Sequence, residues 1–207
     1  MREKRWYPVL YMFAVTALFS SIVIGFTQIT RTRVQANEAL AFERAVVTVF
    51  PQLDQTRMSS LQIHSAFTDQ VTEPDETSGG AYTLKQEGRV VGYALPIAGQ
   101  GFWAPIKGII GVDADRNTVT GIVLYEQNET PGLGAEIAKA PFQDQFKDKK
   151  LGSDEKLIRF KRPGEDLGPS DVHAVTGATQ TSTRLERIIN ASLNAWHSQV
   201  GERGGAR

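Results

Sequence analysis

The stretch that decides the fold is Thr176-Gly177-Ala178-Thr179-Gln180-Thr181-Ser182, because it runs directly into a helix. After it, apolar residues recur at helical spacing at Leu185, Ile188, Ile189, Leu193 and Trp196. Thr183 and Glu186 have the spacing of a capping box, and Gly201 is expected to end the helix. The sequence thus predicts a hydroxyl-rich turn at a helix N-terminus, where free N–H groups favour an anion such as phosphate. An ordinary capped turn is the alternative.

This pattern resembles the [Ser/Thr]-Gly-Ala-Thr-x-[Thr/Ser] signature of the FMN-binding domains that carry flavin in covalent linkage. Two small residues keep the turn thin, so a bulky group can lie against the backbone. The resemblance implies one covalent FMN, joined through its phosphate to the hydroxyl of Thr179. It also implies that the neighbouring residues of the motif contact the cofactor: Thr176, Gly177, Ala178, Thr181 and Ser182.

A second motif lies about fifty residues upstream and resembles the Glu-Thr-Pro-Gly-Leu-Gly segment of the same family. It consists of Glu129, Thr130, Pro131, Gly132, Leu133 and Gly134. Pro-Gly is a turn signal, and the two glycines around one leucine let backbone amides approach a flat ligand. We therefore expect these six residues to bind the cofactor. A tight loop between a strand and a helix is the alternative.

A third segment, Gly99-Gln100-Gly101-Phe102-Trp103, resembles the Gly-x-Gly-Leu-Trp element of one branch of this family, the Nqr proteins. Trp103 is a candidate cofactor contact, and the alternative is that it is a core residue. Together the three motifs resemble the membrane-anchored flavin proteins of two ion-translocating complexes, the C component of the Na+-translocating NADH:quinone oxidoreductase (Nqr) and the G component of the Rnf complex. The branch is left open between Nqr and Rnf.

This resemblance implies an electron-transfer subunit of a membrane-bound oxidoreductase (translocase), which is not catalytic alone. Its partners would be the other membrane subunits of an Rnf- or Nqr-type complex and a flavin transferase for maturation. Two alternatives stay open: a membrane-tethered scaffold with the same fold but no flavin, and the flavin domain of another membrane reductase.

The N-terminus predicts a membrane anchor. Residues 6–29 contain no charged side chain, and at 1.5 Å per residue this run can cross a bilayer core of about 30 Å. Arg2, Lys4 and Arg5 precede it, which favours a cytoplasmic N-terminus at residues 1–5 and a soluble domain on the periplasmic side of a bacterial inner membrane. A cleaved signal peptide, with Val34-Gln35-Ala36 as its cleavage site, is the alternative.

Several other classes of function find no support in the sequence. The chain has 23 basic and 23 acidic residues, so nucleic acid is not an expected partner. It has no cysteine, and its three histidines are widely spaced, so no metal site is expected. The segment from Asp113 to Asn117 opens like a calcium loop but lacks the required glycine, which favours a turn. No catalytic residue is assigned, and no nicotinamide-binding motif is present.

The soluble part is predicted to have an α+β fold. A juxtamembrane helix over 30–50 leads into one domain at 51–200, followed by a flexible tail at 201–207. Two antiparallel hairpins are expected, Ala81–Gln86 with Arg89–Pro96 and Ile106–Val112 with Thr118–Glu126. The remaining expectations are a loop over Thr68–Gly80, a helix over Ala135–Phe146 and a short strand over Lys156–Lys161.

Overall fold

The computed structural model describes residues 6–53 and 58–204 and divides into two compact units, with the boundary between Ala39 and Leu40. The first unit is occupied by helix α1 (Trp6–Thr48), whose last turns belong to the second. The apolar part of α1 has a mean hydropathy of 2.2 and exposed side chains, and by length and composition it can cross a membrane. The predictions made for residues 1–5 and for the end of the tail at 205–207 fall outside the described residues.

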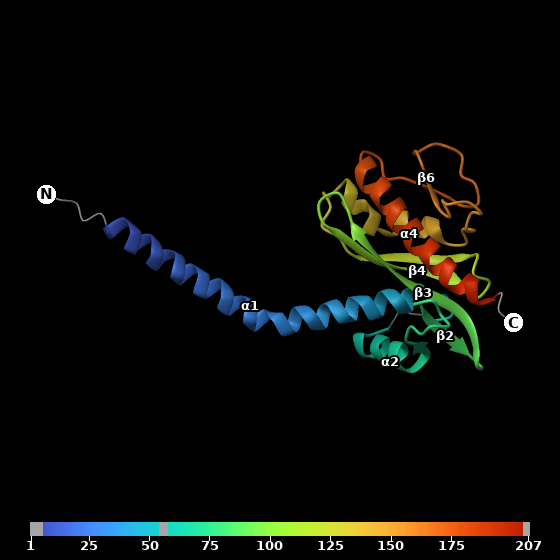
Figure 1. Cartoon of the computed structure of the whole chain (residues 1–207), viewed down its shortest axis with the longest axis horizontal. Coiled ribbons are helices and arrows are strands. Elements are labelled where there is room, and N and C mark those ends of the chain that lie inside the picture. Colours follow the sequence, from blue (N-terminus) through green and yellow to red (C-terminus); the bar gives the residue numbers. More distant parts are fainter. Residues whose placement is uncertain (1–5, 54–57, 205–207) are drawn as a thin grey trace. The chain divides into compact units, whose positions relative to one another are not determined.

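The second unit is built on a five-stranded antiparallel sheet with the strand order β1-β2-β3-β4-β5 (Figure 1). The strands are β1 (Val71–Thr72), β2 (Tyr82–Gln86), β3 (Arg89–Gln100), β4 (Pro105–Asp113) and β5 (Val119–Glu126). Both predicted hairpins are present, and the α+β class is confirmed. Positive φ angles at Glu87 and Gly88 produce the tight turn of the first hairpin. The two hairpins form one meander, since β3 continues to Gln100 and pairs with β4.

Each face of the sheet covers a hydrophobic core. On one face, Leu84, Ala94 and Ile109 pack with the end of α1 and with α2 (Ser60–Gln70). On the other face, alternate strand residues such as Leu95 and Ile110 pack with α4 (Thr179–Gly204). In Figure 1, α4 and α2 lie on opposite sides of the sheet. Burial on both faces explains why the strands are rich in apolar residues and do not alternate strictly with polar ones.

The loop predicted over Thr68–Gly80 is wrong in its first part, because α2 continues to Gln70 and β1 follows directly. The helix begins at a capping box, in which the Ser59 hydroxyl accepts from the Gln62 amide and the Gln62 side chain accepts from the Ser59 amide. This Ser-x-x-Gln spacing is visible in the sequence and could have revealed the helix.

The prediction of a single helix over Ala135–Phe146 is wrong. The segment forms three short pieces: η1 (Gly134–Ala138), α3 (Ala140–Gln143) and η2 (Asp144–Phe146). Pro141 lies in the first turn of α3. Proline has no N–H to donate to the preceding turn, so a continuous helix is interrupted there and begins again.

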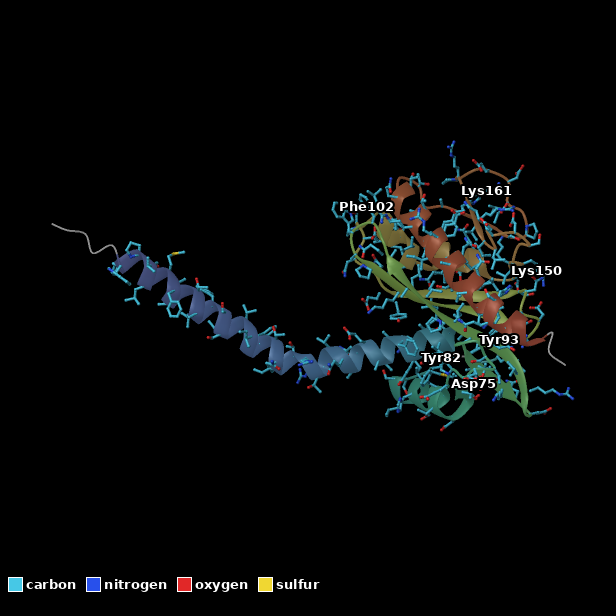
Figure 2. The ribbon with its side chains drawn as sticks, viewed as in Figure 1. Asp75, Tyr82, Tyr93, Phe102, Lys150 and Lys161 are labelled. Atoms are coloured by element: carbon cyan, nitrogen blue, oxygen red, sulfur yellow. The ribbon has the colours of Figure 1, made fainter. Side chains whose placement is uncertain are left out.

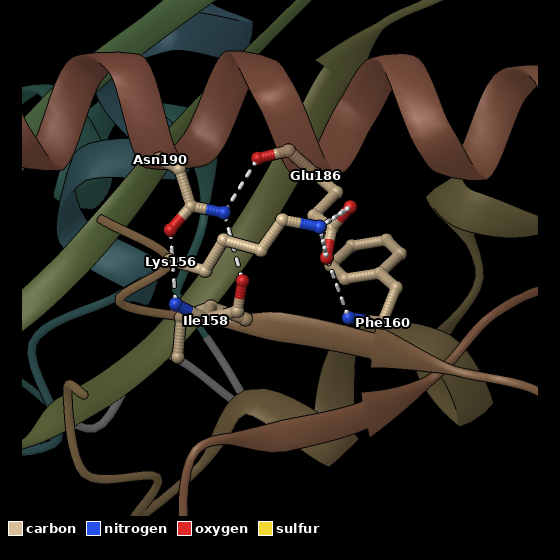
Figure 3. A network of polar contacts seen from close by, with 5 residues as sticks. All are labelled: Lys156, Ile158, Phe160, Glu186 and Asn190. Atoms are coloured by element: carbon tan, nitrogen blue, oxygen red, sulfur yellow. Dashed lines mark hydrogen bonds and ion pairs between the residues drawn. The ribbon is translucent and has the colours of Figure 1, made fainter. Parts of the chain in front are cut away.

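A second, two-stranded sheet pairs β6 (Arg159–Lys161) in parallel with β7 (Asp171–His173), so the predicted strand over Lys156–Lys161 is shorter than expected. Side chains of α4 bind the free edge beside β6 (Figure 3). The Asn190 amide donates to the Ile158 carbonyl at 2.7 Å and accepts from the Ile158 N–H at 3.0 Å. This two-point contact fixes the short sheet against the helix.

Glu186 belongs to the same contact and not to the predicted capping box. Its carboxylate accepts from the Phe160 amide at 3.0 Å and pairs with Lys156 at 3.2 Å. The start of the helix explains the difference, since α4 begins at Thr179, four residues before the predicted cap at Thr183. The helix also continues through Gly201 to Gly204, so the glycine does not end it.

Candidate functional site

The three sequence motifs meet at one buried carboxylate. Glu129, only 5% exposed, follows β5 in the loop at 127–133. One of its oxygens accepts from the Trp103 amide at 3.0 Å, and the other accepts from the Thr181 hydroxyl at 2.7 Å. The β3–β4 turn, the loop after β5 and the first turn of α4 are therefore joined through one side chain, although they lie far apart in the sequence.

Two glycines make room for this contact. A Cβ atom on Gly101 would lie 2.6 Å from a Glu129 carboxylate oxygen. A Cβ atom on Gly134 would lie 2.5 Å from the Thr181 hydroxyl oxygen and 2.9 Å from the Glu129 Cβ. The sequence suggested that Gly134 lets amides approach a ligand. The structure provides a different reason for the glycine, which is that no side chain fits between Glu129 and Thr181.

The hydroxyl groups around the start of α4 fall into two sets. Thr181 and Ser182 are 3% and 2% exposed, and both hydroxyl groups are already hydrogen-bonded. Thr181 donates to Glu129, and Ser182 accepts from the Val175 amide at 3.2 Å. By contrast, Thr176, Thr179 and Thr183 are exposed. An external group can therefore reach the exposed three without breaking the core, whereas the other two are committed to the fold.

The turn before α4 is shaped by Gly177, whose φ of +76° is a conformation that other residues rarely adopt. Its missing side chain also matters, because a Cβ there would approach a Leu133 methyl group at 3.0 Å. The Ser182 amide donates to the Ala178 carbonyl at 3.0 Å, which starts the helical bonding. The N–H groups of the first turn, including that of Thr179, precede this bond and have no acceptor within the helix.

Two hollows adjoin this turn, and Gly177 and Thr179 line both of them. The first, which we name the aromatic hollow, has a volume of about 210 Å³ and no charged residue in its lining. Its walls are Phe102, Thr130, Leu133, Gly134 and residues 177–181. The second, which we name the basic hollow, has a volume of about 520 Å³ and extends along Phe160, Lys161, Arg162, Pro163, residues 174–177, Thr179, Ser182, Thr183 and Glu186.

Large apolar groups remain exposed beside the aromatic hollow. Phe102 and Leu133 are each 42% exposed, and Phe102, labelled in Figure 2, contacts Trp103 edge to face with ring centroids 4.8 Å apart. Trp103 is 66% exposed, which excludes the alternative that it is a core residue. Its indole N–H donates to the Thr130 hydroxyl at 3.1 Å. Pro131 and Gly132 are exposed at the tip of the same loop.

The calcium-like loop and the histidines, which the sequence pattern did not support as metal sites, have other roles in the structure. Asp115 accepts from the amides of Asn117 and Thr118 and thereby forms the predicted turn. Partial desolvation opposes ionisation of this side chain, but the hydrogen bonds from Thr118 and Asn117 outweigh it and lower the pKa of Asp115 to about 2. His173 does not line either hollow, and its Nε2 lies 2.9 Å from the Glu165 carbonyl oxygen. In the described part of the chain, no three His, Asp or Glu residues cluster as a metal site would require.

A comparison with known protein families identifies the class of domain. Residues 101–194, which contain all the walls of both hollows, match the family model of the FMN-binding domain. The resemblance inferred from the sequence is confirmed over these residues.

The particular relatives are the C components (NqrC) of Na(+)-translocating NADH-quinone reductases. The protein of Pasteurella multocida (strain Pm70) is 37% identical over 123 residues, which cover 58% of this chain and 46% of the relative. That of Vibrio anguillarum is 35% identical over 116 residues, covering 55% and 46%. The chain thus spans about half the length of the curated relatives it matches.

Solved structures share the fold. The corresponding reductase component from Parabacteroides distasonis superimposes with a TM-score of 0.65 at 24% identity, over 80% of this chain and 92% of that one. NqrC from Shewanella oneidensis superimposes with a TM-score of 0.67 at 20% identity, over 80% and 96%. The antiparallel sheet with its flanking helices therefore has the NqrC fold.

The contact between Glu129 and Thr181 leads to a stability prediction. Thr181→Val keeps the shape of the side chain but removes the donor to a buried carboxylate, so we expect a loss of about 1–3 kcal/mol in the free energy of unfolding. Urea denaturation of the domain measures it. Thr183→Val is the matched control, since Thr183 is an exposed threonine in the same helix and should change stability by less than about 0.5 kcal/mol. Equal effects of the two substitutions would contradict the role given to Glu129.

Proposed function

We propose that this chain carries one FMN, joined through its phosphate to the Thr179 hydroxyl, and passes electrons one at a time between redox centres on neighbouring membrane subunits. The observation that carries the proposal is the exposure of Thr179 at the boundary of two hollows, while Thr181 and Ser182 are buried and bonded. The match to the FMN-binding domain and the NqrC relatives support it.

The residues around Thr179 fit a flavin phosphate ester. The hydroxyl is accessible, and the first-turn N–H groups of α4 provide donors for phosphate oxygens. The aromatic hollow offers Phe102 and Leu133 to an apolar ring and has no charged wall. Its volume of about 210 Å³ accommodates part of a ring system and leaves the rest open to a partner. Glu129 does not compete for the site, because both of its oxygens are bonded elsewhere.

The chain's own residues position and shield the cofactor. Thr179 holds the phosphate, the α4 amides stabilise its negative charge, and Phe102 with Leu133 excludes water from one side of the hollow. Of the twelve assigned contacts, Thr130, Leu133, Gly134, Gly177, Ala178 and Thr181 line the aromatic hollow, and Thr176 and Ser182 line the basic one. Glu129, Trp103, Pro131 and Gly132 line neither, and we propose that they shape the walls. When bound, FMN supplies the one-electron chemistry.

We further propose that residues 6–29 anchor the chain in a bacterial inner membrane with its domain on the periplasmic side. The partners are then the other membrane subunits of an ion-translocating complex, and a flavin transferase attaches the cofactor. No observation favours the Rnf branch that the sequence left open, so the proposal rests on the Nqr type, with electron flow coupled to ion transport.

Attachment is tested by co-expression with a flavin transferase. The denatured wild-type protein should fluoresce in a gel under ultraviolet light, and mass spectrometry of its peptides should place one FMN on Thr179. Thr179→Ala should abolish the fluorescence because the acceptor oxygen is lost, whereas Thr176→Ala and Thr183→Ala, which remove the other exposed hydroxyls, should retain it. Flavin on a different residue would refute the assignment. A wild-type protein without flavin, beside an active transferase, would favour the scaffold alternative.

Topology is tested with reporters. Alkaline phosphatase fused to the C-terminus should be active, because the enzyme folds only outside the cytoplasm. The purified protein should begin at Met1 or Arg2, as a retained anchor requires. Activity of a cytoplasmic reporter at the same position would reverse the orientation, and an N-terminus immediately after Ala36 would establish the cleaved signal peptide.

The role in the complex is tested by Thr179→Val, which removes the attachment oxygen while keeping the side-chain shape. We expect the complex to assemble, quinone-linked turnover and ion pumping to stop, and NADH oxidation by artificial acceptors upstream to continue. Thr68→Val, at an exposed threonine of α2 that lines neither hollow, should retain full turnover and serves as the control. Ion pumping at the wild-type rate in the Thr179→Val complex would show that this flavin is dispensable.

A further inference from the structure

The basic hollow carries two cations that the fold does not use. Neither Lys161 nor Arg162 has an ion pair or a side-chain hydrogen bond in the described part of the chain. Their neighbours differ, since Arg159 pairs with Asp154 and Lys156 pairs with Glu186. Unpaired cations that line a hollow of about 520 Å³ are available to an anionic ligand.

No acidic side chain in the lining competes for these cations. Glu186 is the one acid among the lining residues, and its carboxylate is occupied by the Phe160 amide and by Lys156. The acidic residues Glu165 and Asp166 follow in the same loop but do not line the hollow. The hollow also contains exposed hydroxyls, those of Thr176, Thr179 and Thr183.

The two hollows have complementary chemistry on either side of Thr179. The aromatic hollow has Phe102 and Leu133 in its lining and no charged residue, whereas the lining of the basic hollow includes two unpaired cations. Figure 2 labels one residue of each, Phe102 in the β3–β4 turn and Lys161 in β6. A ligand with an apolar ring and an anionic phosphate would place its ring in the first hollow and its phosphate toward the second.

We propose that the basic hollow is a phosphate subsite in which Lys161 and Arg162 bind the phosphate oxygens of the flavin, while the ring occupies the aromatic hollow. The inference rests on the proposed function, because it assigns the two ends of the same cofactor. It adds that the chain recognises the phosphate itself before any covalent bond forms, through cations supplied by β6 and the residue after it.

The test compares free FMN with riboflavin, which has the same ring and no phosphate. The protein is produced without flavin transferase, and both dissociation constants are measured by flavin fluorescence at low salt. We expect FMN to bind at least about fivefold more tightly than riboflavin, with a difference that shrinks as salt screens the charges. Lys161→Gln/Arg162→Gln should reduce the preference to the part that the first-turn amides of α4 provide, and should leave riboflavin binding unchanged. The single variant Arg162→Gln, at an exposed position, should reduce it in part.

The control is Lys85→Gln/Arg89→Gln, which removes one lysine and one arginine from the exposed β2–β3 hairpin and should keep the preference. The proposal is overturned if the unmodified protein shows no preference for FMN, if the Lys161/Arg162 variant keeps the full preference of the unmodified protein, or if riboflavin binding falls equally. Because no covalent bond is involved, this outcome is separate from in-gel fluorescence after transferase treatment, which tests the attachment to Thr179.

Discussion

The site depends on the hydrogen bonds of one buried carboxylate. Glu129 accepts from the Trp103 amide and the Thr181 hydroxyl, and so connects the β3–β4 turn to the start of α4. A buried carboxylate is costly unless donors surround it, so the contact is stable only while all three segments are in place. The hydrogen bonds of Glu129 also require glycine at positions 101 and 134, because a Cβ atom at either position would clash with Glu129 or Thr181. The aromatic hollow is the space that this arrangement leaves beside Thr179.

The sheet provides the rigid support for this arrangement. Apolar residues on its two faces bind α4 on one side, and α2 with the end of α1 on the other. A cluster of aromatic rings, Phe42 from α1 with Phe67, Tyr82 and Tyr125, completes the second contact. The last turns of α1 are therefore part of the core of the domain, held there by packed side chains.

Burial also decides which of several similar hydroxyls can react. Five Thr and Ser residues lie between positions 176 and 183, and their chemistry is nearly the same. The structure commits Thr181 and Ser182 to hydrogen bonds in the core and leaves Thr176, Thr179 and Thr183 accessible. The attachment that we propose at Thr179 would then depend on the surrounding surface, to which the aromatic and basic hollows contribute different chemistry.

The sequence by itself determined what depends on local pattern: the apolar helix at the N-terminus, the hairpins with their Glu87-Gly88 turn, the α+β class and the resemblance to flavin domains. It failed where a distant residue decides the outcome. Glu186 had the spacing of a cap but binds Phe160 in β6. The steric role of Gly134, which makes room for Thr181, was likewise absent from the local pattern. Only the tertiary structure showed that Glu129 is buried and that Thr179 lies between two hollows. The physical reason is that burial and hydrogen-bond partners arise from segments distant in the chain, which a local pattern does not contain.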